Sequence, residues 1–187
     1  MIPLKNRRQI ERGVKLILQG LGEDPTREGL RDTPTRVSKM YADILDGNFA
    51  KEPRVTMFEE ESYNGVVMIH HVPYFSFCEH HLMPFTGEFA IAYVPDKKII
   101  GVSKLVRIFR HRCKRVTIQE RLVSDAADDL MRLLEAKGVM VYAEAQHMCM
   151  THRGVKSPGS RMTTSSARGV FLTNDVTRQQ FMEVATK

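Results

Sequence analysis

The chain has 187 residues, 42% hydrophobic and 27% charged, with a formal net charge of +6 and a sequence pI near 9.3. These values fit a globular domain and exclude a disordered chain, and no apolar run approaches the roughly 20 residues of a membrane helix. The N-terminus lacks the apolar core of a secretory signal, and three cysteines, an odd number, favour reduced thiols over a disulfide framework. We therefore expect a cytoplasmic protein with no membrane partner. Its positive charge suits a polyanion, either nucleic acid or a phosphorylated small molecule.

Residues 1–50 are predicted to form a helical segment. Apolar residues at spacings of three and four predict an amphipathic helix over residues 6–21, followed by a Gly- and Pro-rich loop over 20–34. Asp32 or Thr33 is expected to cap a second helix that starts near Pro34. The residues expected to be buried along these two helices are Ile10, Val14, Ile17, Leu18, Leu21, Val37, Met40, Tyr41, Ile44 and Leu45.

Residues 51–187 are predicted to form the main domain. Short β-rich runs over 65–77 and 85–102 precede a helix over 101–112 that Ser103 would cap. A long helix over 117–138 is expected to end at Gly138, and a strand over 139–150 follows. Residues 151–168 are polar and indicate a flexible segment, and residues 181–187 indicate the end of a helix. This order favours an α+β domain with helices on one face of an antiparallel sheet, and no Gly-rich nucleotide fingerprint is present.

Two clusters pair cysteine with histidine, "CEHH" at 78–81 and "HMC" at 147–149. If the clusters meet, Cys78 and Cys149 supply two thiolates, and His81 is the better third ligand because a turn brings positions i and i+3 together. Two cysteines and one histidine with an open fourth position are typical of catalytic zinc. Cys113 would close the site as a structural one, but its cationic neighbours in "RHRCKR" indicate a solvated face. His80 and His147 then remain to move protons.

Cationic residues could surround such a centre. Ser103, Lys104 and Arg107 lie at a predicted helix start, where free N–H groups favour anions. Arg153 follows Cys149 by four residues, and Arg36 and Lys39 add two cations from the N-terminal segment. Together they could bind several phosphates, although any one of them could equally be a solvated charge. Glu120 could accept two hydrogen bonds from a guanine-like edge, or it could simply favour the helix dipole.

The chain resembles the GTP cyclohydrolase I family over nearly its whole length. The segments that carry this resemblance occur in order: "IERGVKLILQGLGEDPTREGLRDTPTRVSKMY", "YFSFCEHHLMPF", "GVSKLVRI", "QERL", "AQHMCMTHRG" and "TTSSARGVF". The resemblance implies hydrolysis of GTP to 7,8-dihydroneopterin triphosphate with release of formate. It also implies the tunnelling fold, an α+β fold whose antiparallel four-stranded sheet has helices packed on one face. A homodecamer with active sites at subunit interfaces would be expected.

The resemblance also implies roles for individual residues. Cys78, His81 and Cys149 match zinc ligands, and His80 and His147 match proton-transfer histidines. The positions that match substrate-binding residues are Gln119 and Glu120 for guanine, Ser103, Lys104, Arg107 and Arg153 for the ribose and triphosphate, and Arg36 and Lys39 for phosphate in a neighbouring subunit's site. Cys113 matches no ligand and is expected to be a free thiol.

Three other functions compete with this one. A zinc-stabilised basic nucleic-acid-binding module would suit the charge, but the paired ligand spacing of a zinc finger is missing and aromatic residues are sparse. A zinc nucleobase deaminase would need a signature that this sequence lacks. A GTP-binding pseudo-enzyme would keep the assembly but lack the catalytic activity. The intact set of site residues argues against this alternative.

Overall fold

The computed structural model describes residues 1–60 and 62–187 and divides the chain into two compact units, Met1–Lys51 and Glu52–Lys187. The first unit is a pair of helices, α1 (Leu4–Gly20) and α2 (Thr33–Ile44). A hydrogen bond from the Ser38 hydroxyl to the Arg7 carbonyl, 3.0 Å long, joins them.

The expected apolar stripe of the first unit is only partly covered. α1 has no buried residue, and of the predicted residues Ile17 and Leu21 are 62% and 73% exposed. In α2 the buried residues are the small Ser38 and Ala42, not the large apolar residues predicted from the sequence, most of which are half-buried. The prediction of two helices is confirmed, but none of the ten residues expected to be buried is fully buried in a single copy of the chain.

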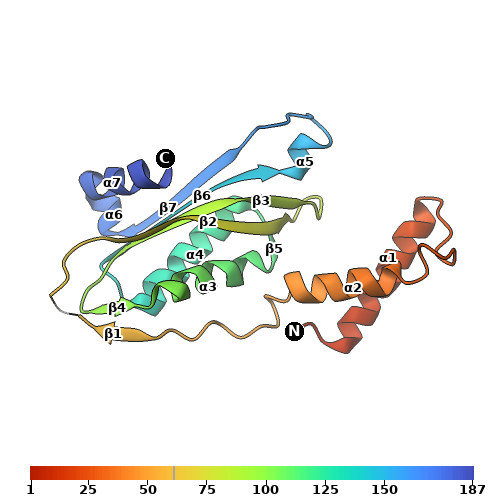
Figure 1. Cartoon of the computed structure of the whole chain (residues 1–187), viewed down its shortest axis with the longest axis horizontal. Coiled ribbons are helices and arrows are strands. Elements are labelled where there is room, and N and C mark those ends of the chain that lie inside the picture. The colour runs from red at the N-terminus through yellow and green to blue at the C-terminus, as the bar shows by residue number, and fades with distance from the viewer. Residues whose placement is uncertain (61) are drawn as a thin grey trace. The chain divides into compact units, whose positions relative to one another are not determined.

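The second unit is a curved sheet with helices on both sides (Figure 1). Its elements are β1 (Met57–Glu59), β2 (Val67–Cys78), β3 (Pro84–Val94), β4 (Lys98–Ile100), α3 (Val102–Cys113), β5 (Val116–Thr117), α4 (Gln119–Leu134), β6 (Gly138–His147), α5 (Met148–Thr151), β7 (Met162–Gly169), α6 (Val170–Thr173) and α7 (Asp175–Ala185). The large sheet has the order β5-β2-β3-β6-β7, and β1 and β4 form a separate pair.

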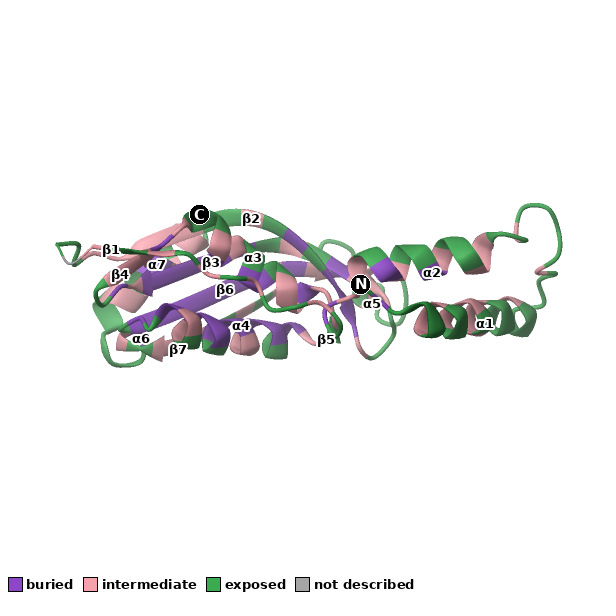
Figure 2. Ribbon diagram, turned by 90° about the horizontal axis from the view of Figure 1, so that it is seen from below, coloured by how far each residue is buried: buried purple, intermediate pink, exposed green. Residues whose placement is uncertain are grey.

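The sheet is mixed and carries helices on two faces, which corrects the prediction of a purely antiparallel sheet covered on one face. The four long strands pair antiparallel, while the two-residue β5 pairs parallel with the end of β2. Apolar residues of α3 and α4 pack on one face around Phe89, Leu105 and Leu130. A smaller core on the other face contains Phe171 and Phe181 from α6 and α7. Figure 2 shows buried residues concentrated in β3, β6 and the inner side of α4.

Three predicted element boundaries are wrong for identifiable reasons. The N-cap of α3 is Gly101, and Ser103 lies inside the first turn. α4 ends at Leu134, and its C-cap residue Glu135 adopts φ +50°. Gly138 instead opens β6, where an added Cβ would lie 2.6 Å from the Val170 side chain. The polar segment 151–168 contains most of β7, an edge strand whose Thr and Ser residues suit a half-exposed ladder.

An ion pair joins the two helices that lie under the sheet. The Arg112 guanidinium of α3 donates to both carboxylate oxygens of Asp129 on α4, at 2.5 and 2.7 Å, and Arg132 donates to Asp129 at 3.1 Å. Burial pushes the pKa of Asp129 upward, but the guanidinium groups of Arg112 and Arg132 outweigh burial and leave the pKa below its usual value. Removing one partner of a buried, bidentate ion pair destabilises the fold strongly, because the other charge then stays buried without compensation.

Asp129→Asn is expected to lower the free energy of unfolding by about 2–3 kcal/mol at neutral pH, because Arg112 loses its buried partner. Since folding lowers the Asp129 pKa, its contribution is present above the unfolded-state value near 4 and is lost as pH falls through the folded-state value. The difference between the proteins should therefore shrink in acid, as measured by urea unfolding at several pH values. Asp125→Asn is the control, because Asp125 is 42% exposed and should change stability by less than about 0.5 kcal/mol. Equal effects of both changes would contradict a role specific to Asp129.

Candidate metal centre

The "CEHH" run forms a tight turn where β2 ends. The Cys78 N–H donates to the Met83 carbonyl and the Leu82 N–H donates to the Cys78 carbonyl, both at 2.9 Å, so the turn closes on itself. Leu82 adopts φ +52°, which lets the chain reverse into β3. The turn fixes Cys78 at the end of the sheet and leaves the side chains of His80 and His81 exposed.

Cys78, His81 and Cys149 form a group whose ligand atoms all lie within 4.8 Å of one another. The two cysteines meet because β3 pairs antiparallel with both β2 and β6. The last residues of β2 and of β6 therefore both lie beside the first residues of β3, at the same end of the sheet. The predicted strand over 139–150 is wrong at its end. β6 stops at His147, and Cys149 lies in the one-turn helix α5, so strand alternation does not place it.

The donor set fits zinc. Burial raises the pKa of the Cys149 thiol, the neighbouring Cys78 sulfur raises it further, and Arg153 opposes the rise. Two thiolates so close together repel each other unless a cation lies between them. Two sulfurs and one imidazole nitrogen are ligands that zinc accepts, and a fourth position would remain for water.

His147 lies beside this group and is held from two sides. Its ring stacks on Phe85 with centroids 4.5 Å apart and planes 4° apart, and its Nε2 lies 2.9 Å from the Gln119 side-chain oxygen. Burial lowers the pKa of His147, while the charge of Glu120 opposes this shift. His80 also lies beside the group, with its Nδ1 3.8 Å from the Cys78 sulfur.

Contacts to the turn also position the start of α4. The Glu79 N–H donates to the Thr117 carbonyl at 3.1 Å, and the Glu79 carboxylate forms an ion pair with Arg121. These contacts bring the first turn of α4 against the "CEHH" turn. Glu120 is therefore exposed beside the metal group, where its charge acts on His147.

The residues matched to phosphate binding do not all gather at this edge. Arg153 follows α5 and acts on Cys149, so it lies at the metal group. Ser103 and Lys104 begin α3 beside β4, at the opposite end of the sheet (Figure 1). At about 3.3 Å per residue, β3 from Phe85 to Val94 is roughly 30 Å long, and this separates the two ends.

The remaining matched cations lie elsewhere. Arg107 lies one turn further along the exposed side of α3. Arg36 and Lys39 lie on α2 in the first unit, where Arg36 donates to the Gly29 carbonyl and the Thr33 hydroxyl at 3.3 and 3.1 Å.

Cys113 is buried, which corrects the expectation of a solvated face around it. Its side chain packs in the core beneath the sheet, and its carbonyl accepts a 2.9 Å hydrogen bond from Ser76. Burial raises the pKa of the Cys113 thiol. It is not among the clustered ligand atoms of the described residues, and it remains a free thiol.

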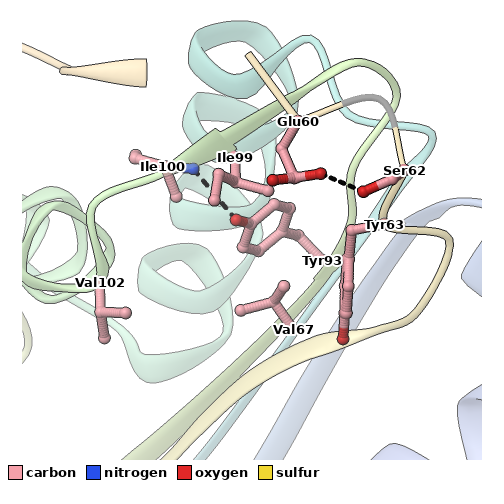
Figure 3. A pocket seen from close by; sticks show the side chains of 8 residues that line it. All are labelled: Glu60, Ser62, Tyr63, Val67, Tyr93, Ile99, Ile100 and Val102. Atoms are coloured by element: carbon pink, nitrogen blue, oxygen red, sulfur yellow. Dashed lines mark hydrogen bonds between the residues drawn. The ribbon is translucent and has the colours of Figure 1, made fainter. Parts of the chain in front are cut away.

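A pocket of about 450 Å³, which was not predicted from the sequence, lies beside the β1–β4 pair (Figure 3). Val67, Ile99 and Val102 provide apolar lining, and the Tyr93 hydroxyl turns away to accept a 3.1 Å hydrogen bond from the Ile100 N–H. The pocket was missed because residues 85–102 were predicted as one β-rich run. In the structure the chain leaves β3 after Val94 and forms the separate strand β4. The pocket lies where α3 begins, at the end of the sheet opposite the metal group.

Comparison with known proteins identifies one family. The chain matches the GTP cyclohydrolase I family over residues 10–186. It is 45% identical to GTP cyclohydrolase 1 of Carboxydothermus hydrogenoformans over 95% of this chain and 93% of that protein. It is 46% identical to the proteins of the same name from Geobacillus kaustophilus, covering 98% of both chains, and Aquifex aeolicus, covering 96% of both. A crystal structure of an apo archaeosine synthase QueF-Like is similar at 14% identity and a TM-score of 0.44, covering 56% of this chain and 93% of that one, too low to carry an argument.

Cys149→Ser should weaken zinc binding by at least about 100-fold, because even residues outside the ligand set typically change affinity by 10- to 100-fold. Metal content after gel filtration, measured by plasma mass spectrometry, gives the readout. His147→Ala is the matched control two residues away and should retain zinc in full. Loss of zinc from His147→Ala would show that His147 is a ligand and that the assigned ligand set is wrong.

Proposed function

The chain belongs to the GTP cyclohydrolase I family and hydrolyses GTP to 7,8-dihydroneopterin triphosphate with release of formate, and we propose that Cys78, His81 and Cys149 hold the zinc ion required. The observation that carries this assignment is the clustering of two thiols and one imidazole beside His147 and Glu120. Zinc, when bound, supplies a Lewis acid that lowers the pKa of a bound water. The remaining chemistry falls to side chains of this chain.

We assign proton transfer to His80 and His147, which both lie beside the metal group. The stacked ring of His147 is suited to repeated transfers because Phe85 fixes its plane. Ring opening at C8 of the purine and loss of formate both require protons to be delivered to nitrogen and removed from oxygen. Two histidines next to the group can divide these transfers between them.

We assign guanine recognition to Glu120. Its exposed carboxylate beside His147 can accept from the N–H groups of a guanine edge, and such a pair of bonds fixes orientation as well as affinity. Arg153 at the same edge would bind phosphate. Holding the base and the triphosphate at separate points would fix C8 over the metal group, and such orientation is worth several kcal/mol of the barrier.

We further propose that each active site is completed by a second copy of the chain. Ser103 and Lys104 lie at the far end of a strand roughly 30 Å long, so they cannot touch a triphosphate whose base lies at the metal group of the same chain. A neighbouring copy can supply this helix start. The uncovered apolar residues of α1 also favour association, since they gain burial only in an assembly.

Several finer assignments belong to the same proposal. The homodecamer, the tunnelling fold and phosphate binding by Arg107, Arg36 and Lys39 are the arrangements that family membership suggests. No helix among the described residues is long and apolar enough to span a bilayer. A cytoplasmic location stays a prediction.

Purified, zinc-replete protein mixed with GTP should release one formate for each pterin formed, as measured by a coupled formate assay and by product fluorescence. Glu120→Ala should raise KM for GTP by roughly 10- to 100-fold, since a lost charged hydrogen-bonding partner costs about 1.5–3 kcal/mol. Absence of formate would exclude the hydrolase. Tight GTP binding without formate would instead support the pseudo-enzyme, and binding of nucleic acid alone would support the zinc-stabilised module.

Two inactive variants should restore each other if active sites are shared. Cys149→Ser alone and Lys104→Ala alone are expected to lose most activity, because one lacks a metal ligand and the other a phosphate contact. After joint unfolding and refolding, mixed assemblies should contain some sites with both residues intact, and GTP turnover should return. A mixture of Cys149→Ser with Cys78→Ser serves as the control and should stay inactive. Equal inactivity of both mixtures would mean that each chain builds its site alone.

A further inference from the structure

Gln119 is the largest fully buried polar side chain in the second unit. It is the first residue of α4 and has no solvent exposure. Its amide nitrogen lies 3.1 Å from the Ala143 carbonyl, 2.9 Å from the Met162 carbonyl and 3.1 Å from the Thr164 hydroxyl. These three oxygens belong to β6 and β7, so the amide joins the start of α4 to two strands of the sheet.

The surroundings of the amide decide which end is nitrogen. The two backbone carbonyls can only accept hydrogen bonds, so an oxygen placed there would face two acceptors at about 3 Å. The NH2 group must therefore face β6 and β7. The amide oxygen then points to His147, whose Nε2 lies 2.9 Å away.

This orientation determines the tautomer of His147. The amide oxygen can only accept, so His147 Nε2 must carry a hydrogen. A neutral imidazole has one N–H, and Nδ1 therefore carries the free lone pair. When Nδ1 gains a proton the ring becomes imidazolium, Nε2 keeps its hydrogen, and the bond to Gln119 is unchanged. Gln119 can thus hold the ring in both protonation states without moving.

We propose that Gln119 is a positioning residue that fixes His147 as its Nε2–H tautomer, so that every proton His147 exchanges with the substrate passes through Nδ1. This proposal rests on the proton-transfer role proposed for His147. It assigns two restraints to one ring. The stacked Phe85 fixes the plane, and Gln119 fixes rotation within that plane.

The family resemblance gives Gln119 another role, as a reader of guanine together with Glu120. The structure favours a division of labour between these two neighbours. Glu120 is exposed, whereas the Gln119 side chain is enclosed and both of its amide hydrogens have internal acceptors. Of these two side chains, we therefore assign the recognition of guanine to Glu120 alone.

Neutron diffraction from deuterated crystals of the zinc-loaded protein reads the tautomer directly. A deuteron on Nε2, directed at the Gln119 oxygen, is the expected result. A bare Nε2 beside a deuterated Nδ1 would overturn the proposal. This measurement needs no turnover, so it can be read even if the protein releases no formate from GTP.

Gln119→Met tests the consequence for catalysis. The change removes the acceptor at similar volume, and kcat should fall by on the order of 100-fold or more, as expected when a general acid–base group is misdirected. KM for GTP should stay within about twofold and zinc should remain bound. A raised KM with kcat unchanged would instead make Gln119 a substrate contact and overturn the proposal.

Ser165→Ala is the matched control on the exposed side of β7 and should leave both constants unchanged. Circular dichroism and assembly size establish that Gln119→Met is folded. If that variant does not fold, the neutron result on the unaltered protein decides alone.

Discussion

The antiparallel pairing of β3 with both β2 and β6 is the constraint on which the site depends. It sets Phe77 opposite Pro84 and Phe85 opposite His147. The start of β3 and the ends of β2 and β6 therefore lie together at one end of the sheet. A slip of one residue in either pairing would turn every side chain of the slipped strand to the other face, and a slip between β3 and β6 would move His147 off Phe85. Of the three candidate metal ligands, Cys78 ends β2, while His81 and Cys149 lie just beyond the strands, in the "CEHH" turn and in α5. Register therefore positions them more than their own local geometry does.

Three buried polar side chains join neighbouring elements of the second unit through hydrogen bonds. Gln119 joins α4 to β6 and β7, Ser76 joins β2 to the end of α3, and Asp129 joins α4 to α3. Each of these bonds is costly to lose from one side, because a buried partner would remain unpaired. The result is a rigid support behind the exposed side chains of His81 and Glu120, as a catalytic site requires.

The sequence was sufficient for the three candidate metal ligands to be grouped, since Cys78, His81 and Cys149 are close in the structure as the two Cys/His clusters suggested. It also predicts an apolar stripe along α4 from the helical spacing of its residues; Leu122, Ala126, Leu130 and Leu134 of this stripe are buried, while Ile118 and Leu133 are half-buried. The sequence did not predict that Cys113 is buried, because the charges of "RHRCKR" do not show which side of the helix faces the core. Nor did it show that Gln119 is enclosed, since that depends on β7, and β7 is made of polar residues that read as a loop. These failures share a cause, which is that long-range pairing overrides local composition.

The separation between the metal group and the start of α3 has a genetic consequence. If one site takes its ligands from one copy and its phosphate contacts from another, then a chain altered at Ser103 or Lys104 impairs a site that is not its own. In a cell that makes both a normal and an altered form, the fraction of impaired sites would match the fraction of altered chains. A normal chain beside an altered one would lose the site built on its own ligands, while the altered chain could still hold an active site completed by a normal neighbour. Substitutions that prevent the chain from folding, by contrast, would keep it out of the assembly and would behave as recessive.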